Sequence, residues 1–551
     1  MSRQGLRLFH TARYLRRQQI AYRIWYRLQK PSPDPRPAPA VRSMTNGWVA
    51  PIDKPVAMVA ADRFRFLNVE HPLSSAADWN HPDRPKLWLY NLHYFDDLTA
   101  SNAIDRSTWH HDLIRRWLAE NPPAQGNGWE PYPVSLRIVN WIKWALAERD
   151  RHPESKVPVP LSAEVLHSLA VQSRYLRKRL EYHLLGNHLF ANAKALVFAG
   201  LFFQGEEAEE WLSRGLKILG AEIPEQILPD GGNFERSPMY HAIIHEDLLD
   251  LVNLYRAYGR DVHVDWLDAC IRMRAWLKAM SHPEGGIALF NDAAFGIAPN
   301  WAELDAYAER LGLSRQEYPP RPLTRFPETG YVRCEKEAAV LLLDVAPVGP
   351  DYIPGHAHAD TLNFELSLFG RRVIVDSGTS TYEKNAERQR QRGTAAHNTV
   401  TINGEDSSEV WGGFRVARRA RPFDVETGER AGKVRVACAH DGYRRLPGKP
   451  VHRREWQLAE GELLVRDTIE GKFREAIARY HFHPEVQVEL GSAGEGRGTL
   501  SGGEGFTFQV EKGTARLIDT TWHPEFNVSL PNRCLEVVLD GHAAEVRFVW
   551  Q

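Results

Sequence analysis

Residues 163–185 read AEVLHSLAVQSRYLRKRLEYHLL, and apolar residues return every three or four positions along this stretch. That spacing predicts an amphipathic helix. Similar patterns recur from residue 87 to residue 313, separated by Pro and Gly and not interrupted by strand-like alternation. The segments share no fixed repeat length, so we expect an incomplete (α/α) toroid or an irregular helical array, not a regular solenoid.

The pattern changes near Thr324, where short β-rich segments begin. Residues 456–471, WQLAEGELLVRDTIEG, show the alternation of strands, and Asn403-Gly404 is a typical hairpin turn. Helices followed by strands predict an α+β multidomain protein with a helical domain before an antiparallel β domain. We place a basic helix and Pro-rich linker in residues 1–80, the helical domain in residues 81–323 and the β domain in residues 324–551.

Composition excludes several classes of protein. The chain has 551 residues and a formal net charge of -1, so it offers no overall field for gathering nucleic acid. Its four cysteines lie far apart without a CxxC pair, which argues against a disulfide framework and a thiolate zinc site. Neither a GxSxG motif nor a phosphate-binding glycine loop occurs, so a serine nucleophile and nucleotide cofactors are not expected.

The N-terminal segment is basic, and residues 1–30 contain no Asp or Glu. No run of about 18 apolar residues predicts a transmembrane helix. The segment also lacks the apolar core and cleavage site of a signal peptide, which predicts a cytoplasmic location, with the periplasm as the alternative. Two interpretations stay open: a helix lying on an anionic membrane surface, and a helix packed on its own protein with a solvated basic face. The second is the commoner case.

A polar cluster in residues 230–241, DGGNFERSPMYH, has a helix-start signature. Ser237 is a good N-cap and Pro238 a good first helical residue, which places Tyr240 in the first turn. The helix dipole and nearby Arg236 would favour the phenolate, as an acid or base requires. Taken alone, the tyrosine is more often a packed structural residue.

The most specific cluster is GHAHAD, residues 355–360. His358 can join Asp376 and His397, which stand at strand ends, as ligands of Zn²⁺. His356 would then be free to act on a substrate. The alternative is three separately hydrogen-bonded residues. The motif also resembles the HxHxDH loop of metallo-β-lactamase-like hydrolases, but Thr361 stands at the last His position and the preceding half is helical.

An aromatic segment at residues 128–137, GWEPYPVSLR, forms a junction between a loop and a helix. Trp129, Tyr132 and Arg137 are candidates for binding a sugar and its carboxylate, because aromatic rings stack on sugars and guanidinium pairs with carboxylates. The alternative for this region is a packed helix with its tryptophans in the core.

Together these segments resemble the heparinase II/III-like polysaccharide lyases over about residues 80–430. The matching stretches are GNHLFANAKAL (186–196), DGGNFERSPMYH (230–241), GHAHADTLNFEL (355–366), VIVDSGTSTY (373–382) and AHNTVTING (396–404). The resemblance implies an α/α toroid followed by an antiparallel β-sandwich, with the active site in the cleft between them.

The resemblance also implies β-elimination on a uronic-acid polysaccharide, such as a capsule, an exopolysaccharide or a glycosaminoglycan-like chain. Asn187, with His188 nearby, matches the residue that neutralises the uronate carboxylate, which lowers the cost of removing the C5 proton. Tyr240 and His356 match the proton-transfer pair. Whether the base is Tyr240 (syn elimination) or His356 (anti elimination) stays open.

The same resemblance makes His358, Asp376 and His397 ligands of a mainly structural zinc. Arg236 and Arg392 are weaker candidates for binding substrate carboxylates. Three other functions remain as alternatives: a glycoside hydrolase, a zinc hydrolase using the HAHAD loop, and a non-catalytic protein that binds acidic polysaccharides.

Overall fold

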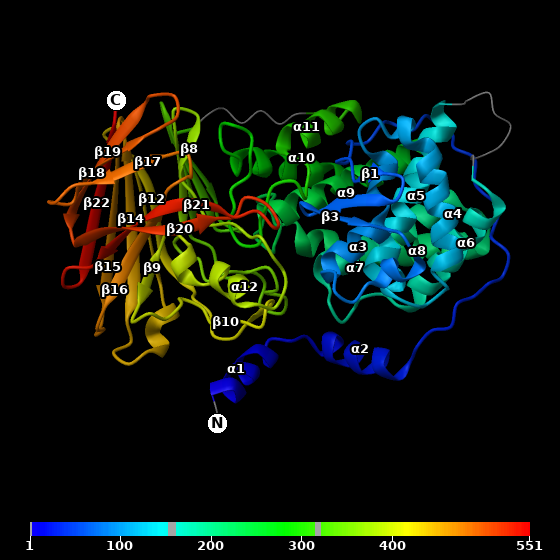
Figure 1. Cartoon of the computed structure of the whole chain (residues 1–551), viewed down its shortest axis with the longest axis horizontal. Helices are drawn as coiled ribbons and strands as arrows, with labels where there is room; N and C mark the ends of the chain where they lie inside the picture. Colours follow the sequence, from blue (N-terminus) through cyan, green and yellow to red (C-terminus); the bar gives the residue numbers. More distant parts are fainter. Residues whose placement is uncertain (1–2, 152–160, 315–320) are drawn as a thin grey trace.

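The computed structural model describes residues 3–151, 161–314 and 321–551. Figure 1 shows most of the helices in one half of the molecule and the large sheets in the other. The helices are α1 (Arg3–Ala12), α2 (Arg17–Leu28), α3 (Lys86–Tyr94), α4 (Ser107–Glu120), α5 (Pro131–Arg151), α6 (Ala163–Lys178), α7 (Gly186–Phe202), α8 (Glu206–Gln226), α9 (Pro238–Ala257), α10 (Val264–Ala279), α11 (Trp301–Arg310) and α12 (Ala386–Gln391).

Helix α7 is the centre of the helical domain. Its sequence, GNHLFANAKALVFAGLF, is mostly apolar without a solvent-facing polar side, and all but one of its residues are buried. Helices α5, α6, α8 and α9 pack around it. A helix that is apolar all round is stable only when neighbours cover it completely, so α7 fixes the positions of the helices that form the site.

The second half is built from antiparallel sheets. Their strand orders are β4-β5-β6-β7-β8, β20-β21-β16-β9, β12-β13-β14-β15-β22-β19-β18-β17 and β10-β11. The strands are β4 (Leu323–Phe326), β5 (Tyr331–Lys336), β6 (Ala339–Asp344), β7 (Phe364–Leu368), β8 (Arg371–Ile374), β9 (Val400–Ile402), β10 (Val410–Trp411), β11 (Arg415–Val416), β12 (Pro422–Arg430), β13 (Lys433–His440), β14 (Val451–Ala459), β15 (Glu462–Glu470), β16 (Ala476–His481), β17 (Gln487–Leu490), β18 (Glu495–Thr499), β19 (Gly505–Lys512), β20 (Thr514–Trp522), β21 (Leu530–Val538) and β22 (Ala543–Trp550).

One hydrophobic core joins the three large sheets. It includes Leu341 of β6, Leu535 of β21 and Val465 of β15, all fully buried. Strand β14 alternates buried and half-buried residues, the pattern of a strand with one face on the core. The predicted fold class, a helical toroid followed by an antiparallel β-sandwich, is confirmed.

The N-terminal region differs from the sequence prediction in two ways. Two helices, α1 and α2, replace the single basic helix, and the expected linker contains a small antiparallel sheet of β1 (Met58–Ala60), β2 (Arg63–Phe66) and β3 (Val69–Pro72). Strands of three or four residues are too short to give a clear alternation, which is why the sequence did not reveal them.

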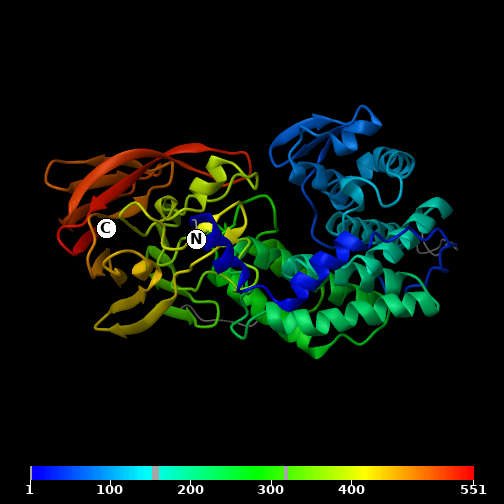
Figure 2. The ribbon, with the colours of Figure 1, turned by 90° about the horizontal axis from the view of Figure 1, so that it is seen from below.

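Helices α1 and α2 span both domains, as Figures 1 and 2 show. On α1, Thr11 accepts a hydrogen bond from Trp411 Nε1 of the sandwich domain at 3.2 Å. On α2, the Tyr26 hydroxyl donates to the Leu180 carbonyl of the helical domain. The prediction of a helix packed on its own protein is therefore correct for one face of this segment. No described helix is long and apolar enough to cross a membrane.

Candidate active site

A cavity of about 620 Å³ lies where the two domains meet. From the helical domain it is lined by residues of α3, α5, α7 and α9, and from the sandwich domain by the loops that carry His356, Tyr382 and Phe414. Five of the predicted site residues line it: Tyr132, Asn187, His188, Tyr240 and His356.

Tyr240 and His356 meet face to face across the domain boundary. Their ring centroids lie 3.8 Å apart with 29° between the ring planes. Helix α9 begins as predicted, with Pro238 first and the Ser237 hydroxyl accepting a hydrogen bond from the Tyr240 backbone N–H at 3.2 Å. The Tyr240 hydroxyl shares a hydrogen bond of 3.2 Å with the hydroxyl of Tyr382.

The predicted bias of Tyr240 toward the phenolate is wrong. Burial raises the pKa of its hydroxyl well above 10, and the neighbouring Tyr382 acts in the same direction. Arg236 does not oppose this, because its guanidinium donates to the backbone carbonyls of Thr329 and Glu328. Desolvation outweighs the helix dipole here, so Tyr240 holds its proton.

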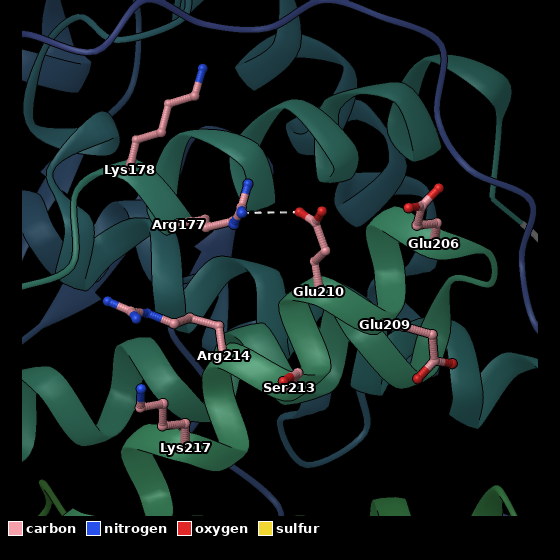
Figure 3. Close-up of a pocket in the computed structure, with 8 residues that line it drawn as sticks. All are labelled: Arg177, Lys178, Glu206, Glu209, Glu210, Ser213, Arg214 and Lys217. Atoms are coloured by element: carbon pink, nitrogen blue, oxygen red, sulfur yellow. Dashed lines mark ion pairs between the residues drawn. The ribbon is translucent and has the colours of Figure 1, made fainter.

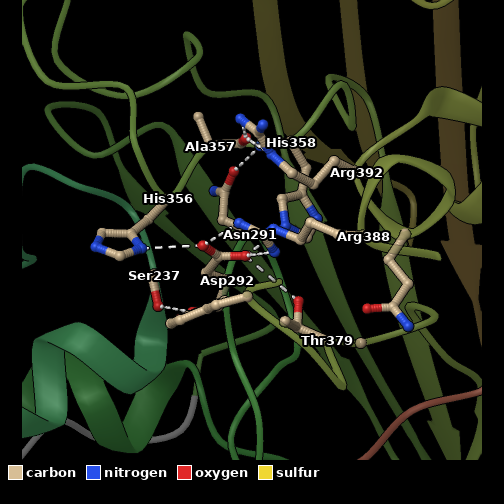
Figure 4. A network of polar contacts seen from close by, with 12 residues as sticks. Ser237, Asn291, Asp292, His356, Ala357, His358, Thr379, Arg388 and Arg392 are labelled. Atoms are coloured by element: carbon tan, nitrogen blue, oxygen red, sulfur yellow. Dashed lines mark hydrogen bonds and ion pairs between the residues drawn. The ribbon is translucent and has the colours of Figure 1, made fainter. Parts of the chain in front are cut away.

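His356 is oriented by a buried carboxylate from the helical domain. Its Nδ1 lies 2.9 Å from Asp292 Oδ2, and a carboxylate can only accept, so Nδ1 carries a proton and, in the neutral ring, Nε2 keeps the lone pair. Asp292 also accepts from His358 Nε2 at 2.8 Å and from both terminal nitrogens of Arg388 (Figure 4). Burial would raise the pKa of Asp292, but Arg388 and the two histidines hold it well below its usual range.

A second carboxylate, Glu235, lies on the other side of His356. Its Oε2 is 3.8 Å from His356 Nε2. Burial raises the pKa of Glu235, although a hydrogen bond from the Asn187 backbone acts in the opposite direction. Gly186, the first residue of α7, leaves space for this carboxylate, because a Cβ at Gly186 would lie 3.1 Å from Glu235 Oε1. The backbone φ of Gly186 is 57°, a left-handed conformation that residues with a Cβ adopt only at a cost.

Asn187, His188 and Tyr132 form the wall beside this pair. Asn187 is buried and stands in the first turn of α7, where the helix dipole favours a bound anion. The His188 ring lies 4.6 Å from the ring of Tyr132, and its Nδ1 is 3.1 Å from Glu181 Oε1. Burial lowers the pKa of His188, but Glu181 outweighs that effect and the net shift is upward.

Four predicted substrate-binding residues lie outside the cavity and have structural partners instead. Trp129 is buried and donates to the Asn121 carbonyl. Arg137 and Arg392 are fully buried. Arg137 donates to the backbone carbonyls of His93 and Gly128, and Arg392 donates to that of Ala357. All four side chains are held by the protein's own groups and none lines the cavity, so these four predictions are corrected.

The three predicted zinc ligands lie together. His397 Nδ1 is 2.7 Å from Asp376 Oδ2, and the rings of His358 and His397 are 5.3 Å apart. In the described part of the chain, His358 Nδ1 and His397 Nε2 are buried without a hydrogen-bond partner. Across those same residues, no group of three or more His, Cys, Asp or Glu side chains is arranged so that it could hold a metal ion.

Sequence reasoning missed three residues of this network. Tyr382, Asp292 and Arg388 gave no local signal of their role, because each comes from a different segment and they meet only in the folded chain. Tyr382 does fall at the end of the quoted stretch VIVDSGTSTY, which was the one clue available.

A second hollow, of about 760 Å³, lies over α6 and α8 (Figure 3). It is larger than the cavity, but it is lined by exposed charged side chains such as Arg177 and Glu210, which form an ion pair of 3.0 Å. It contains no histidine, tyrosine or buried acid, so it lacks the groups that proton transfer requires.

Two family models match the chain: "Heparinase II/III N-terminus" over residues 103–307 and "Heparinase II/III-like, C-terminal" over residues 318–551. The chain belongs to the heparinase II/III-like family.

Relatives of two kinds are similar in sequence. A heparin-sulfate lyase of Bacteroides stercoris is 28% identical over 42% of this chain and 37% of its own length. The FtsZ-localized protein C of Caulobacter vibrioides is 25% identical over 74% of this chain and 71% of its own length. The chain thus spans well under half of that lyase. Among solved structures, heparinase III has a TM-score of 0.68 at 19% identity, covering 86% of this chain and 78% of its own, and supports the shared fold.

Proposed function

We propose that this protein is a polysaccharide lyase that cleaves a uronic-acid polymer by β-elimination. The observation that carries the proposal is the stacked pair of Tyr240 and His356, which meets beside Asn187 in a cavity between the domains. The names of the heparin-sulfate lyase relatives support the same reaction class.

The hydrogen bond of His356 and the burial of Tyr240 favour His356 as the base and Tyr240 as the acid. His356 Nε2 takes the C5 proton, the C5–H electron pair forms the C4–C5 double bond, and the C4–O4 bond breaks as O4 takes the proton of Tyr240. His356 suits the base because Asp292 fixes its proton on Nδ1. Tyr240 suits the acid because burial keeps it protonated. The products are a 4,5-unsaturated uronate end and a free hydroxyl.

Asn187 and His188 support the step by stabilising charge. The amide of Asn187 can donate hydrogen bonds to the uronate carboxylate, where negative charge builds up as the C5 proton leaves. His188, whose pKa is raised by Glu181, adds positive charge on the same wall. Tyr132 completes this wall beside His188 and offers a flat face to a sugar ring.

The experiment is incubation with a panel of uronic-acid polymers while absorbance of the unsaturated uronate is followed. A rise in absorbance with wild type, absent in Tyr240→Phe, supports the lyase. New reducing ends without that absorbance would identify a hydrolase. Binding without either product would identify a non-catalytic protein.

We propose that His358, Asp376 and His397 hold a structural zinc ion. Two buried ring nitrogens, His358 Nδ1 and His397 Nε2, have no hydrogen-bond partner in the described structure. The other ring nitrogen of His358 hydrogen-bonds to Asp292, as in zinc-binding histidines, and that of His397 hydrogen-bonds to Asp376, the third proposed ligand. A zinc ion there would stiffen the loops that carry His356.

Elemental analysis of the purified protein checks the zinc proposal. We expect close to one zinc per chain, and we expect His358→Ala to lose the metal and to melt at a lower temperature. A His358→Ala protein that melts like the parent and keeps its metal rules out this ligand assignment.

We propose that α1 and α2 attach the protein to an anionic membrane surface. Large apolar side chains remain exposed on both helices although one face is packed: Phe9 is 56% exposed, Ile24 56% and Leu28 77%. Arginines flank them, as in helices that lie in a membrane interface. Such a site suits a lyase that acts on a capsule or exopolysaccharide that the cell makes or imports, and fractionation of cells tests the predicted cytoplasmic location.

A further inference from the structure

A bridge of hydrogen bonds connects the two domains beside the cavity. It joins the turn between β2 and β3, which packs near α3 of the helical domain, to the loop between β20 and β21 of the sandwich. The Asn68 side-chain amide donates to Glu525 Oε2 at 2.8 Å and to the Phe526 carbonyl at 3.1 Å. The side-chain amide of Asn527 donates back to the Leu67 carbonyl at 2.8 Å. Figures 1 and 2 show the small sheet beside this loop.

Both sides of the bridge form part of the cavity wall. Leu67 lines the cavity from the small sheet, and Phe526 lines it from the sandwich. The Phe526 ring lies 4.8 Å from the ring of Tyr382, edge to face, and Tyr382 in turn hydrogen-bonds to Tyr240. The bridge therefore closes the cavity next to the pair of residues that would transfer protons.

The turn that forms the bridge has an unusual backbone. Leu67 has a φ of 53° and Asn68 a φ of 59°, so both are left-handed. Asn adopts this conformation readily, but a leucine does so only at a cost, because its Cβ approaches the backbone carbonyl too closely. Two-residue turns of this kind usually contain Asn-Gly. A strained residue in a cavity wall indicates a function for its side chain.

The cavity also has a closed end inside the helical domain. Asp250 lies ten positions after Tyr240 on α9, about 15 Å further along the helix axis. Its Oδ2 is 2.9 Å from Lys143 Nζ and 2.7 Å from Lys194 Nζ, and its Oδ1 accepts from the Tyr307 hydroxyl at 3.1 Å. The three charged side chains are between 1% and 4% exposed, so a sugar chain cannot continue past them.

We propose that the lyase is exolytic, because the bridge and the closed end let a polymer enter only by one of its ends. The inference rests on the proposed function, since it states how that lyase engages its polymer. The middle of a long chain would need two exits from the cavity, one on each side of the cleaved bond. The bridge blocks the exit beside Tyr382, so Leu67, Asn68 and Asn527 determine the mode of cleavage without touching the reacting atoms.

The test compares a short and a long size fraction of one polymer at equal mass concentration, well below KM. The polymer is the one among heparan sulfate, chondroitin sulfate, hyaluronan and alginate on which the wild type produces most unsaturated uronate. With mean lengths that differ about tenfold, we expect an initial rate about tenfold higher on the short fraction, because only chain ends react. Size-exclusion chromatography should show the smallest products from the first minutes, without intermediate fragments.

A variant with an opened bridge combines Leu67→Gly, Asn68→Gly and Asn527→Gly. All three residues are left-handed, with φ between 53° and 60°, so glycine removes their side chains without adding backbone strain. We expect the ratio of the two initial rates to fall to about twofold or less, because interior bonds then react as well as chain ends. Intermediate fragments should appear early in the reaction.

The matched control combines Asn102→Gly and Asn403→Gly. Both residues are left-handed asparagines, with φ of 54° and 56°, and neither lines the cavity, so the control should keep the ratio of the wild type. Equal wild-type rates on the two fractions, with early intermediate fragments, overturn the exolytic mode alone. A bridge variant that keeps the wild-type ratio overturns the role of the bridge. No unsaturated product from the wild type on any of the four polymers overturns the proposed function and this inference with it.

Discussion

At the residue scale, the proposed elimination depends on one phenol hydroxyl. Tyr240→Phe removes the proposed acid but keeps the ring that stacks on His356. We expect kcat to fall by about 10²- to 10⁴-fold, because a positioned general acid contributes that much. Substrate affinity and melting temperature should stay close to those of the parent, since only the 3.2 Å hydrogen bond to Tyr382 is lost.

Tyr382→Phe is the matched control for this substitution. It deletes the same hydrogen bond from the other side and leaves the hydroxyl of Tyr240 in place. We expect it to retain most of the activity. If the two variants lose activity equally, the acid is not Tyr240 alone.

Asp292 is the second residue whose role can be isolated. In Asp292→Asn, His356 loses the carboxylate that fixes its tautomer, and Arg388 is left buried without its anion. We expect kcat to fall by about 10²-fold and stability to fall by about 3 kcal/mol. Steady-state rates measured well below the melting temperature separate the two effects.

Asp467→Asn provides the comparison. Asp467 is likewise fully buried and pairs with Arg454 at 2.8 Å and His452 at 2.7 Å, but it belongs to the sandwich and does not line the cavity. This variant should lose stability without losing kcat per folded molecule. A comparable drop in kcat would mean that Asp292 acts only through general stability.

At the scale of elements, helix α8 contains a pH-sensitive residue. Burial raises the pKa of Glu222 from 4.5 to about 7, although Gln226 donates to its carboxylate. A raised folded-state pKa means that the stabilising protonated form is fully present below pH 4.5 and is lost as the pH rises through about 7. The protonated form of Glu222 therefore changes the free energy of unfolding by at most about 3 kcal/mol across this pH range.

Glu222→Gln should therefore flatten this part of the stability profile. We expect the variant to gain stability over the parent at about pH 8 and to differ little from it at about pH 4. Urea unfolding of both proteins across that range measures the difference. A parent and variant that show parallel profiles would contradict the assignment.

The element scale also shows what the sequence could predict. The start of α9 at Ser237 and Pro238 was predictable because capping is a local rule. The burial of Arg137 was not, because its guanidinium lies 3.9 Å from the Trp117 ring and donates to backbone carbonyls that only tertiary packing brings near. A sequence shows that an arginine follows a loop, but not whether its donors face a substrate or the backbone.

At the scale of the whole molecule, the order of helices and strands predicted the two domains. A cavity lined by both domains could be predicted only from the family resemblance, because no local rule of sequence places Asn187 near His356. Composition could not show that the basic N-terminal segment packs against both domains, since packing depends on partners such as Trp411 and Leu180 that are distant in sequence.

The exposed faces of α1 and α2 lead to the last prediction. We expect the protein to sediment with vesicles that contain phosphatidylglycerol and not with vesicles of phosphatidylcholine alone. Ile24→Asp should weaken this binding strongly. Ile104→Asp, which places the same charge at a side chain 57% exposed in the helical domain, should not. If the two variants sediment equally with the vesicles, α2 does not take part in the membrane contact.

The bond between Asp292 and His356 joins a group of the helical half to one of the sandwich half. If the halves swing apart to admit or release a polymer, the imidazole loses its anchor and can turn to the wrong tautomer. The proposed base would therefore be aligned only when the two domains are closed around the substrate. The hydrogen bond that aligns the proposed base would in this way couple reactivity to enclosure of the sugar.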